Sequence, residues 1–237
     1  DNATLYDRLV YSMGGDFEKR YDDYIKMNKL SAAVTFGSQG TAFMLAGEEF
    51  ARTKLGDENS YSSSVDINKL DWNRTIEYGD LLSYYKGMLE FRNYFAPVRT
   101  ATKLNSVTGS YDNKTGLVQL VYANQDFAWK NVVMLFNDST EDKTVELADT
   151  LPENWIVVVN GLMAGTANLG EISGRAVTVP AGEALFLVAS QSYKASGVVS
   201  SKGTVEVRHI DDSTGEIMST VMLSGNVGDY YYTTASG

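Results

Sequence analysis

The spacing of hydrophobic residues along this chain changes near Pro97. Before that point, apolar residues recur every three to four positions in two stretches, residues 16–36 and 79–95, as on one face of an amphipathic helix. After it, short β-branched and aromatic runs follow at spacings of roughly ten residues, as in an antiparallel β-sandwich. The change predicts a mainly helical part followed by an all-β part that ends near Ser190.

Six runs in the second part predict strands. They are residues 117–122, 131–136, 143–147, 155–160, 176–179 and 184–188. Turns are predicted between them at Asp112-Asn113, Asn137-Asp138, Asn160-Gly161 and Ala181-Gly182, because asparagine, aspartate and glycine favour turn conformations.

The apolar run Thr41–Ala46 lies between the two predicted helices and ends at Gly47. It does not alternate with polar residues, so we expect a strand that is buried on both faces. Helix, buried strand, long loop and helix in this order are typical of α/β folds with parallel strands. The first part holds about two βα units, whereas a closed (β/α)₈ barrel needs about 250 residues, so we expect only a portion of such a sheet.

A long polar loop follows from Gly47 to Trp72. Asn59, Ser60, Tyr61 and Asn68 combine planar amides and hydroxyls with an aromatic face, the groups that hold polyhydroxylated ligands. The alternative is that these residues form turns and bond the local backbone. The loop therefore indicates a sugar-binding surface, with a purely structural role left open.

Two adjacent carboxylates, Glu48 and Glu49, follow the predicted strand directly. Carboxylates in that position face the active end of a barrel. However, neighbours on a turn point in different directions, whereas the two carboxylates of a glycosidase face each other across about 5–9 Å. We therefore favour a scaffold role in which the glutamates contact Arg52.

Composition excludes several classes of protein. A net charge of −10 and a pI near 4.6 argue against a nucleic-acid partner, which requires a basic face. The absence of cysteine excludes disulfides, thiolate chemistry and cysteine-ligated zinc, and His209 alone cannot supply a histidine cluster. No apolar run approaches the roughly 20 residues that span a bilayer, and no phosphate-binding or EF-hand spacing occurs. We therefore expect no membrane insertion and no cofactor, and we assign no metal-binding residues, with calcium binding left open.

The end of the chain is organised differently. Residues 191–202 are small and polar and predict a flexible linker. Beyond it, residues 204–210 and 216–223 predict two strands joined by a turn at 211–215. A hairpin of this size is marginally stable alone, so residues 203–237 read as the opening of another β module.

Two segments of the first part carry a family resemblance. AGEEFARTK and GDENSYSSSVDINKLDW, at residues 46–54 and 56–72, resemble the last barrel strand and the following loop of type I pullulanases. These enzymes belong to the α-amylase superfamily, glycoside hydrolase family 13. DNATLYDRL, at residues 1–9, resembles the end of that superfamily's fourth signature region. The resemblance implies that residues 1–96 are the C-terminal part of a (β/α)₈ barrel and that residues 97–190 are the β-sandwich that follows it.

The resemblance also implies an activity, the retaining hydrolysis of α-1,6 linkages in pullulan, starch or glycogen. Asp1 matches the third catalytic carboxylate, which stabilises the transition state, whereas the nucleophile and the acid/base have no counterpart in this sequence. The implied substrate-binding residues are Asn2, Asn59, Tyr61 and Asn68. The chain departs from its relatives at Ser62, Ser64 and Val65, where they carry asparagine, proline and aspartate. The fragment alone is expected to be inactive.

The tail carries a second resemblance. GTVEVRHIDDSTGEIMSTVMLSGNVGDYYYT, at residues 203–233, resembles the start of a mucin-binding-type (MucBP) repeat of Gram-positive surface proteins. This implies an extracellular or cell-surface protein whose tail contacts cell-wall or mucin glycans. Two alternatives to a pullulanase remain, another hydrolase of the α-amylase superfamily and a non-catalytic carbohydrate-binding or adhesin fragment.

Overall fold

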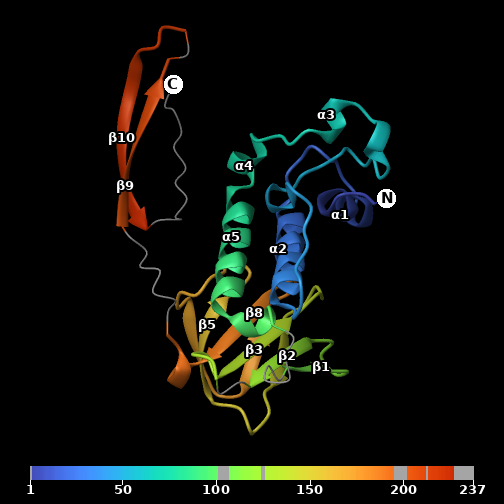
Figure 1. Ribbon diagram of the computed structural model, residues 1–237, viewed down its shortest axis with the longest axis vertical. Helices are drawn as coiled ribbons and strands as arrows, with labels where there is room; N and C mark the ends of the chain where they lie inside the picture. Colours follow the sequence, from blue (N-terminus) through green and yellow to red (C-terminus); the bar gives the residue numbers. More distant parts are fainter. Residues whose placement is uncertain (1, 101–106, 124–125, 195–201, 212, 227–237) are drawn as a thin grey trace. The chain divides into compact units, whose positions relative to one another are not determined.

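The computed structural model describes residues 2–100, 107–123, 126–194, 202–211 and 213–226. The chain divides into two compact units, one that ends at Ser196 and one that begins at Gly197. The first unit holds the helices and two β-sheets, and the second holds a β-hairpin (Figure 1). Asp1 and most of the predicted linker, residues 195–201, lie outside the described residues.

The two predicted helices are confirmed as α2 (Asp22–Gly37) and α5 (Gly79–Tyr94), and a further helix, α1 (Leu5–Met13), precedes them. Short helical turns lie between and after them: η1 (Glu48–Phe50), η2 (Ser60–Ser62), α3 (Val65–Asn68), α4 (Arg74–Glu77) and η3 (Ala96–Val98). Helix α2 begins later than the predicted Asp16 because turns form there first. Asp16 accepts a bond from the Glu18 N–H at 2.9 Å, and its own N–H donates to the Tyr21 hydroxyl at 3.0 Å.

The sheets of the first unit are antiparallel, and they contain all six predicted strands within one residue at each end. The strands are β1 (Val107–Tyr111), β2 (Val118–Ala123), β3 (Asn131–Phe136), β4 (Lys143–Glu146), β5 (Asn154–Val159), β6 (Gly170–Ser173), β7 (Ala176–Val179) and β8 (Ala184–Ala189). One sheet has the order β1-β2-β3-β8-β5-β6, and β4 pairs with β7 in a second sheet. Strands β1 and β6, at the two edges of the larger sheet, were not predicted.

Apolar side chains cover both faces of the six-stranded sheet. Along β3, Val132, Met134 and Phe136 belong to one core cluster, whereas the intervening Val133 and Leu135 belong to another. This alternation follows from the two-residue period of a strand. One cluster packs against the helices, and the other packs against β4 and β7. Because both faces are buried, the central strands read as continuous apolar runs in the sequence.

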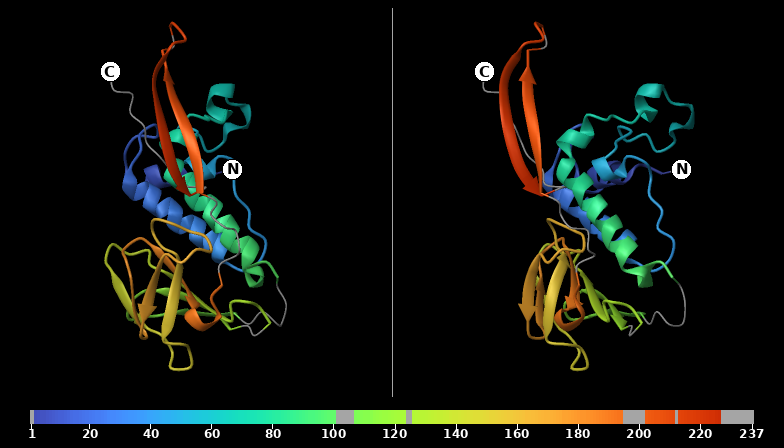
Figure 2. Two further views of the ribbon diagram at one scale, coloured as in Figure 1. Left: turned by 90° about the vertical axis from the view of Figure 1, so that its left-hand side faces the viewer. Right: turned by 60° about the vertical axis from the view of Figure 1, so that its left-hand side comes forward.

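Helices α2 and α5 run side by side in the same direction, and their C-terminal ends meet the sheet (Figures 1 and 2). The contacts are close. A Cβ added at Gly37 would lie 2.6 Å from the ring of Phe186 on β8, and one at Gly87 would lie 2.0 Å from the Ala164 carbonyl oxygen. At both positions only glycine fits without movement of the neighbouring groups.

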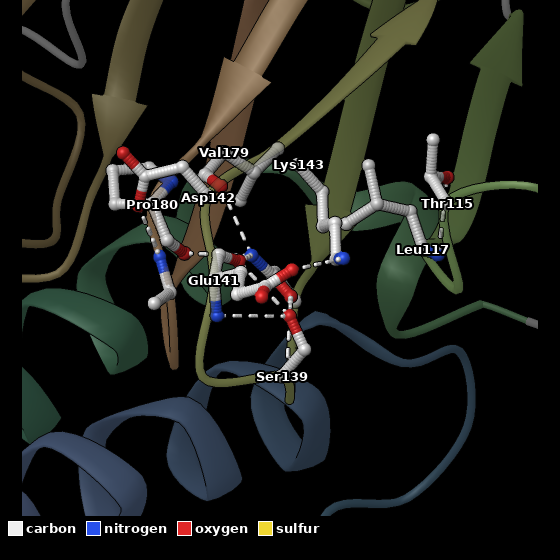
Figure 3. Close-up of polar contacts among 10 residues, drawn as sticks. Thr115, Leu117, Ser139, Glu141, Asp142, Lys143, Val179 and Pro180 are labelled. Atoms are coloured by element: carbon white, nitrogen blue, oxygen red, sulfur yellow. Dashed lines mark hydrogen bonds and ion pairs between the residues drawn. The ribbon is translucent and has the colours of Figure 1, made fainter.

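The turn after β3 is joined to the turn before β8. Asn137 is buried, and its amide nitrogen donates to the carbonyls of Glu141, Val179 and Pro180 at 2.9, 3.0 and 3.1 Å. The Asp142 carboxylate accepts a bond from the Ala181 N–H at 2.9 Å. Figure 3 shows the polar groups of this junction, including Glu141, Asp142 and Pro180. Two turns that the sequence predicts separately therefore form one hydrogen-bonded junction.

The prediction of a buried strand at Thr41–Ala46 is wrong for the described structure. This segment has no strand pairing there, and Phe43 is 88% exposed. A strand requires a partner that satisfies its backbone groups. The strands of the larger sheet pair among themselves, so the described residues offer this segment no neighbour. Its start is held instead by a bond from the Gly40 N–H to the Val98 carbonyl at 3.0 Å.

The predicted hairpin in the second unit is confirmed as β9 (Lys202–Ile210) and β10 (Ile217–Asn226), which pair antiparallel with an irregularity between Ile217 and Ser219. Asp211 closes the turn, because its carboxylate accepts bonds from the N–H groups of Ser213 and Thr214. Gly215 adopts a φ of 73°, which favours glycine. Across the described part of both units, no helix has the length and hydrophobicity needed to cross a membrane.

Candidate functional site

A hollow of about 440 Å³ opens beside the N-terminal segment, within the range of ligand-binding pockets. Its walls include Asn2 and Arg8 from the N-terminal segment, Ser31 and Thr35 from α2, and Phe43 and Glu48 from the segment after α2. We call it the N-terminal hollow. It places amide, hydroxyl, guanidinium and carboxylate groups beside an exposed aromatic ring, the kind of surface that suits a polyhydroxylated ligand.

Asn2, a predicted substrate-binding residue, lies at the mouth of this hollow. Its side-chain oxygen accepts a hydrogen bond from the guanidinium of Arg8 on α1. Helix α1 begins just after it, where the Thr4 hydroxyl caps the helix by accepting a bond from the Asp7 N–H at 3.1 Å.

Glu48 and Glu49 have separate partners. Glu48 accepts a bond from the Tyr85 hydroxyl on α5 at 2.9 Å, and Glu49 accepts one from the Gly47 N–H at 2.9 Å. Burial raises the pKa of Tyr85, and the neighbouring Glu48 raises it further, so the hydroxyl stays protonated and able to donate. The two carboxylates act on different groups, which agrees with a scaffold role.

The expected contact of the glutamates with Arg52 is wrong. Arg52 donates instead to backbone carbonyls, to Ala46 at 3.1 Å and to Asn68. It thereby joins the beginning of the 47–72 loop to its later part. An arginine fork suits this task, since it carries several donors in a fixed plane.

A second arginine holds the loop from α4. Arg74 is buried and donates twice to the Ala51 carbonyl, at 3.1 and 2.6 Å, while its guanidinium lies 4.4 Å from the ring centre of Tyr78. Ala51 has a φ of 54°, in the left-handed region that a non-glycine residue rarely adopts. Such backbone costs about 1–3 kcal/mol and persists only where surrounding contacts hold it. Here the arginine and complete burial supply those contacts.

The structure brings two of the polar loop residues together. The Asn68 amide donates to the Ser60 carbonyl at 2.7 Å and accepts from the Ser60 hydroxyl at 2.9 Å. Asn59 is exposed, with its N–H bonded to Asp57 at 3.0 Å, and the Tyr61 side chain is 86% exposed on η2. Asn68 thus orders the loop, and the side chains of Asn59 and Tyr61 face solvent.

Asp7 on α1 is a site residue that the sequence reasoning missed. It is fully buried, and its carboxylate accepts bonds from the Thr53 hydroxyl and from the Lys54 N–H, the latter at 2.9 Å. The Lys54 ammonium in turn donates to the Ser60 hydroxyl at 2.5 Å. The Thr4-x-x-Asp7 spacing matches a helix capping signal, so the sequence suggests only a local role.

A separate carboxylate joins the helices. Asp80 at the start of α5 bonds Arg20 at 2.9 Å and Lys29 on α2 at 3.0 Å. Burial alone would raise the pKa of Asp80, but the hydrogen bonds and charges of Arg20 and Lys29 lower it below its usual value. This ion cluster fixes α2 relative to α5.

Within the described ranges, no group of three or more histidine, aspartate or glutamate side chains is placed to hold a metal ion. The arrangement around the hollow therefore consists of hydrogen-bonding side chains and an exposed aromatic ring. Such a surface can bind and orient a neutral, hydroxyl-rich molecule.

No protein-family model matches this chain. Among curated proteins, it is similar to a pullulanase of Bacillus subtilis strain 168, with 27% identity over 156 residues. That match covers 64% of this chain and 21% of the relative. The chain therefore spans about a fifth of the length of this curated relative.

Solved structures of pullulanases are also similar. The pullulanase from Bacillus acidopullulyticus matches with a TM-score of 0.70 and 33% identity, over 79% of this chain and 23% of that protein. The type I pullulanase of Bacillus subtilis strain 168, solved in complex with maltose, matches with a TM-score of 0.68 and 22% identity, over 79% of this chain and 26% of that one. In sequence and in structure, the chain is thus similar to one segment of the type I pullulanases.

Proposed function

We propose that this chain is the C-terminal portion of an α-glucan-debranching glycoside hydrolase of the pullulanase type. In this proposal, residues 1–96 form the end of its (β/α)₈ barrel and residues 97–190 form a β-sandwich. Residues 191–202 contain the linker, with Tyr193 and Lys194 at its start packed against Trp129 of the first unit, and residues 203–237 open a further β module. The observation that carries the proposal is the 33% identity and TM-score of 0.70 with the Bacillus acidopullulyticus pullulanase.

The helical part supports a barrel portion. Helices α2 and α5 run in the same direction, as successive helices of parallel βα units do, and Thr41–Ala46 lies between them in the sequence (Figure 1). Phe43 and Leu45 of that segment are 88% and 40% exposed. An apolar segment without a sheet partner fits a barrel strand whose neighbours come from upstream sequence.

The chemistry follows from this placement. Retaining hydrolysis of an α-1,6 linkage requires a carboxylate nucleophile and a carboxylic acid/base, which upstream barrel strands supply in this proposal. Asp1 then stabilises the oxocarbenium-like transition state, and Asn2, Asn59, Tyr61 and Asn68 belong to the substrate-binding surface. No cofactor takes part, because two carboxylates and water suffice. The maltose complex of the Bacillus subtilis enzyme supports an α-glucan oligosaccharide as the ligand class.

The test compares substrates and chain lengths. The complete protein, with its upstream residues, is expected to release reducing ends from pullulan and few from linear amylose, whereas residues 1–237 alone release none from either. Preferential cleavage of amylose would favour another hydrolase of the α-amylase superfamily. A complete protein that binds glucan but cleaves neither polymer would favour the non-catalytic alternative.

For the tail we propose an extracellular or surface-attached location on a Gram-positive bacterium, with residues 203–237 contacting cell-wall or mucin glycans. The resemblance to mucin-binding repeats and the β9–β10 hairpin support this proposal. We expect the complete protein to be retained on immobilised mucin, and deletion of residues 203–237 to abolish the retention. Equal retention of both proteins would contradict the proposed role.

A further inference from the structure

We infer that Asp7 is a positioning residue that holds the 47–72 loop against helix α1 and thereby sets the site for the glucan. This inference rests on the proposed function. Asp7 does not touch the substrate in it; it acts through the segments that do. Its carboxylate joins two segments that carry predicted substrate-binding residues, Asn2 before α1 and Asn59, Tyr61 and Asn68 in the loop.

The Asp7 carboxylate does not cap its own helix. In a capping box, an acid at this position bonds back to the N–H of the capping residue. Here the Thr4 hydroxyl caps the helix, but the Asp7 carboxylate bonds the Thr53 hydroxyl and the Lys54 N–H instead. These two hydrogen bonds therefore offset the desolvation penalty of the buried carboxylate. They join residues that are more than forty positions apart in the chain.

The contact between Asp7 and residues 53–54 holds an unusual turn. The Thr53 hydroxyl, which donates to Asp7, accepts a bond from the Leu55 N–H at 2.9 Å. Leu55 has a φ of 53°, again in the left-handed region. Tyr11 from the next turns of α1 donates to the Gly56 carbonyl at 2.5 Å. Helix α1 thus holds residues 53–56 at two points.

Further hydrogen bonds connect Lys54 to the part of the loop that carries the proposed substrate-binding residues. Lys54 donates to the Ser60 hydroxyl at 2.5 Å, and that hydroxyl donates to Asn68 at 2.9 Å. Ser60 begins η2, whose next residue is the exposed Tyr61. A chain of hydrogen bonds therefore runs from the buried carboxylate to the turn that presents Tyr61, and a displacement of residues 53–55 moves that turn.

The experiment measures KM and kcat for pullulan in the complete protein. Asp7→Asn leaves the size of the side chain unchanged but cannot accept from both donors, and Thr53→Val removes one donor. Each change is expected to raise KM about 10-fold, since the loss of about 1.4 kcal/mol of substrate contacts from the displaced loop weakens binding tenfold. The double variant is expected to be no worse than Asp7→Asn, because both changes break one interaction.

The control variant is Asn137→Ala, which removes a buried hydrogen-bonding residue from the sheet junction. Its loss of stability lowers the active fraction and hence the apparent kcat, but leaves KM unchanged. Trypsin cleavage after Lys54 provides a readout independent of activity, and it is expected to accelerate in Asp7→Asn and Thr53→Val only. An unchanged KM in both variants, or cleavage no faster than in Asn137→Ala, would overturn the inference. If the unmodified protein does not cleave pullulan, the proposed function fails instead, whatever trypsin reports on Asp7.

Discussion

Replacement of Asp1 by asparagine in the complete protein is expected to lower kcat for pullulan by about 10²- to 10³-fold. This is the typical loss when one group that stabilises developing charge in a transition state is removed. The oxocarbenium-like transition state carries positive charge, which a carboxylate stabilises and a neutral amide does not. In the proposed enzyme the nucleophile and the acid/base are unaltered by this change, so we expect some activity to persist. Steady-state hydrolysis, followed by reducing-end release, measures the effect.

Asp149→Asn is the matched control for this change. The Asp149 side chain is 96% exposed and lies 3.7 Å from the Arg175 guanidinium, a long contact in the β-rich part of the chain. The same substitution there is expected to leave kcat within twofold, since exposed ion pairs contribute little. If Asp1→Asn retained the activity of the Asp149 variant, the assignment of Asp1 to the catalytic machinery would be wrong.

Trp129→Ala is expected to destabilise residues 1–237 by about 3–5 kcal/mol, the usual cost of removing a large buried aromatic side chain. Trp129 is 1% exposed, and its ring centre lies 4.8 Å from that of Tyr94 and 6.0 Å from that of Tyr193. Its indole N–H donates to the Lys194 carbonyl at 2.8 Å. One side chain therefore joins helix α5 to the segment after β8. Urea denaturation followed by circular dichroism measures the loss.

Trp72→Ala removes the same side chain from an exposed position. Trp72 is 66% exposed and contacts Phe50 with ring centres 5.6 Å apart. We expect a loss of about 1 kcal/mol or less, as for most surface substitutions. Equal unfolding midpoints for the two variants would show that the packing around Trp129 contributes less than its burial indicates.

The strands could be predicted from the sequence where burial left a clear pattern. Residues 131–136 and 184–189 are buried along nearly their whole length, so their apolar runs are continuous. Strands β1 and β6 lie at the edges of the larger sheet and are mostly exposed or half-buried. Their backbones pair, but their side chains need not be apolar, and nothing in the sequence distinguishes them from loops.

Thr41–Ala46 shows the opposite failure. Its apolar residues predict burial, yet burial depends on a partner strand that the described residues do not provide. The apolar composition of a segment indicates that it can form a buried strand. Whether it does so depends on a neighbouring strand with which it can pair.

The candidate site was predictable only in part. The position of the polar loop agrees with the sequence reasoning, because residues 47–72 hold only short helical turns. The hydrogen-bond partner of Glu48 is Tyr85, and the partners of Arg52 are the Ala46 and Asn68 carbonyls. None of them was predictable, because these groups come close only in the folded chain. Asp7 was missed because its spacing from Thr4 matches a helix-capping signal, which is already a sufficient local explanation for an acidic residue at that position.

The burial of both faces of the six-stranded sheet has a consequence for how such a chain can change in evolution. Phe36 and Phe91 from the helices share one core with Met134 and Phe186 from the sheet. A recombination event that exchanged residues 97–190 for an unrelated β-domain would leave these aromatic side chains facing water or an ill-fitting surface. We therefore expect the end of the helical part and the sheet to be inherited as one block, with exchange of modules tolerated only beyond Ser196.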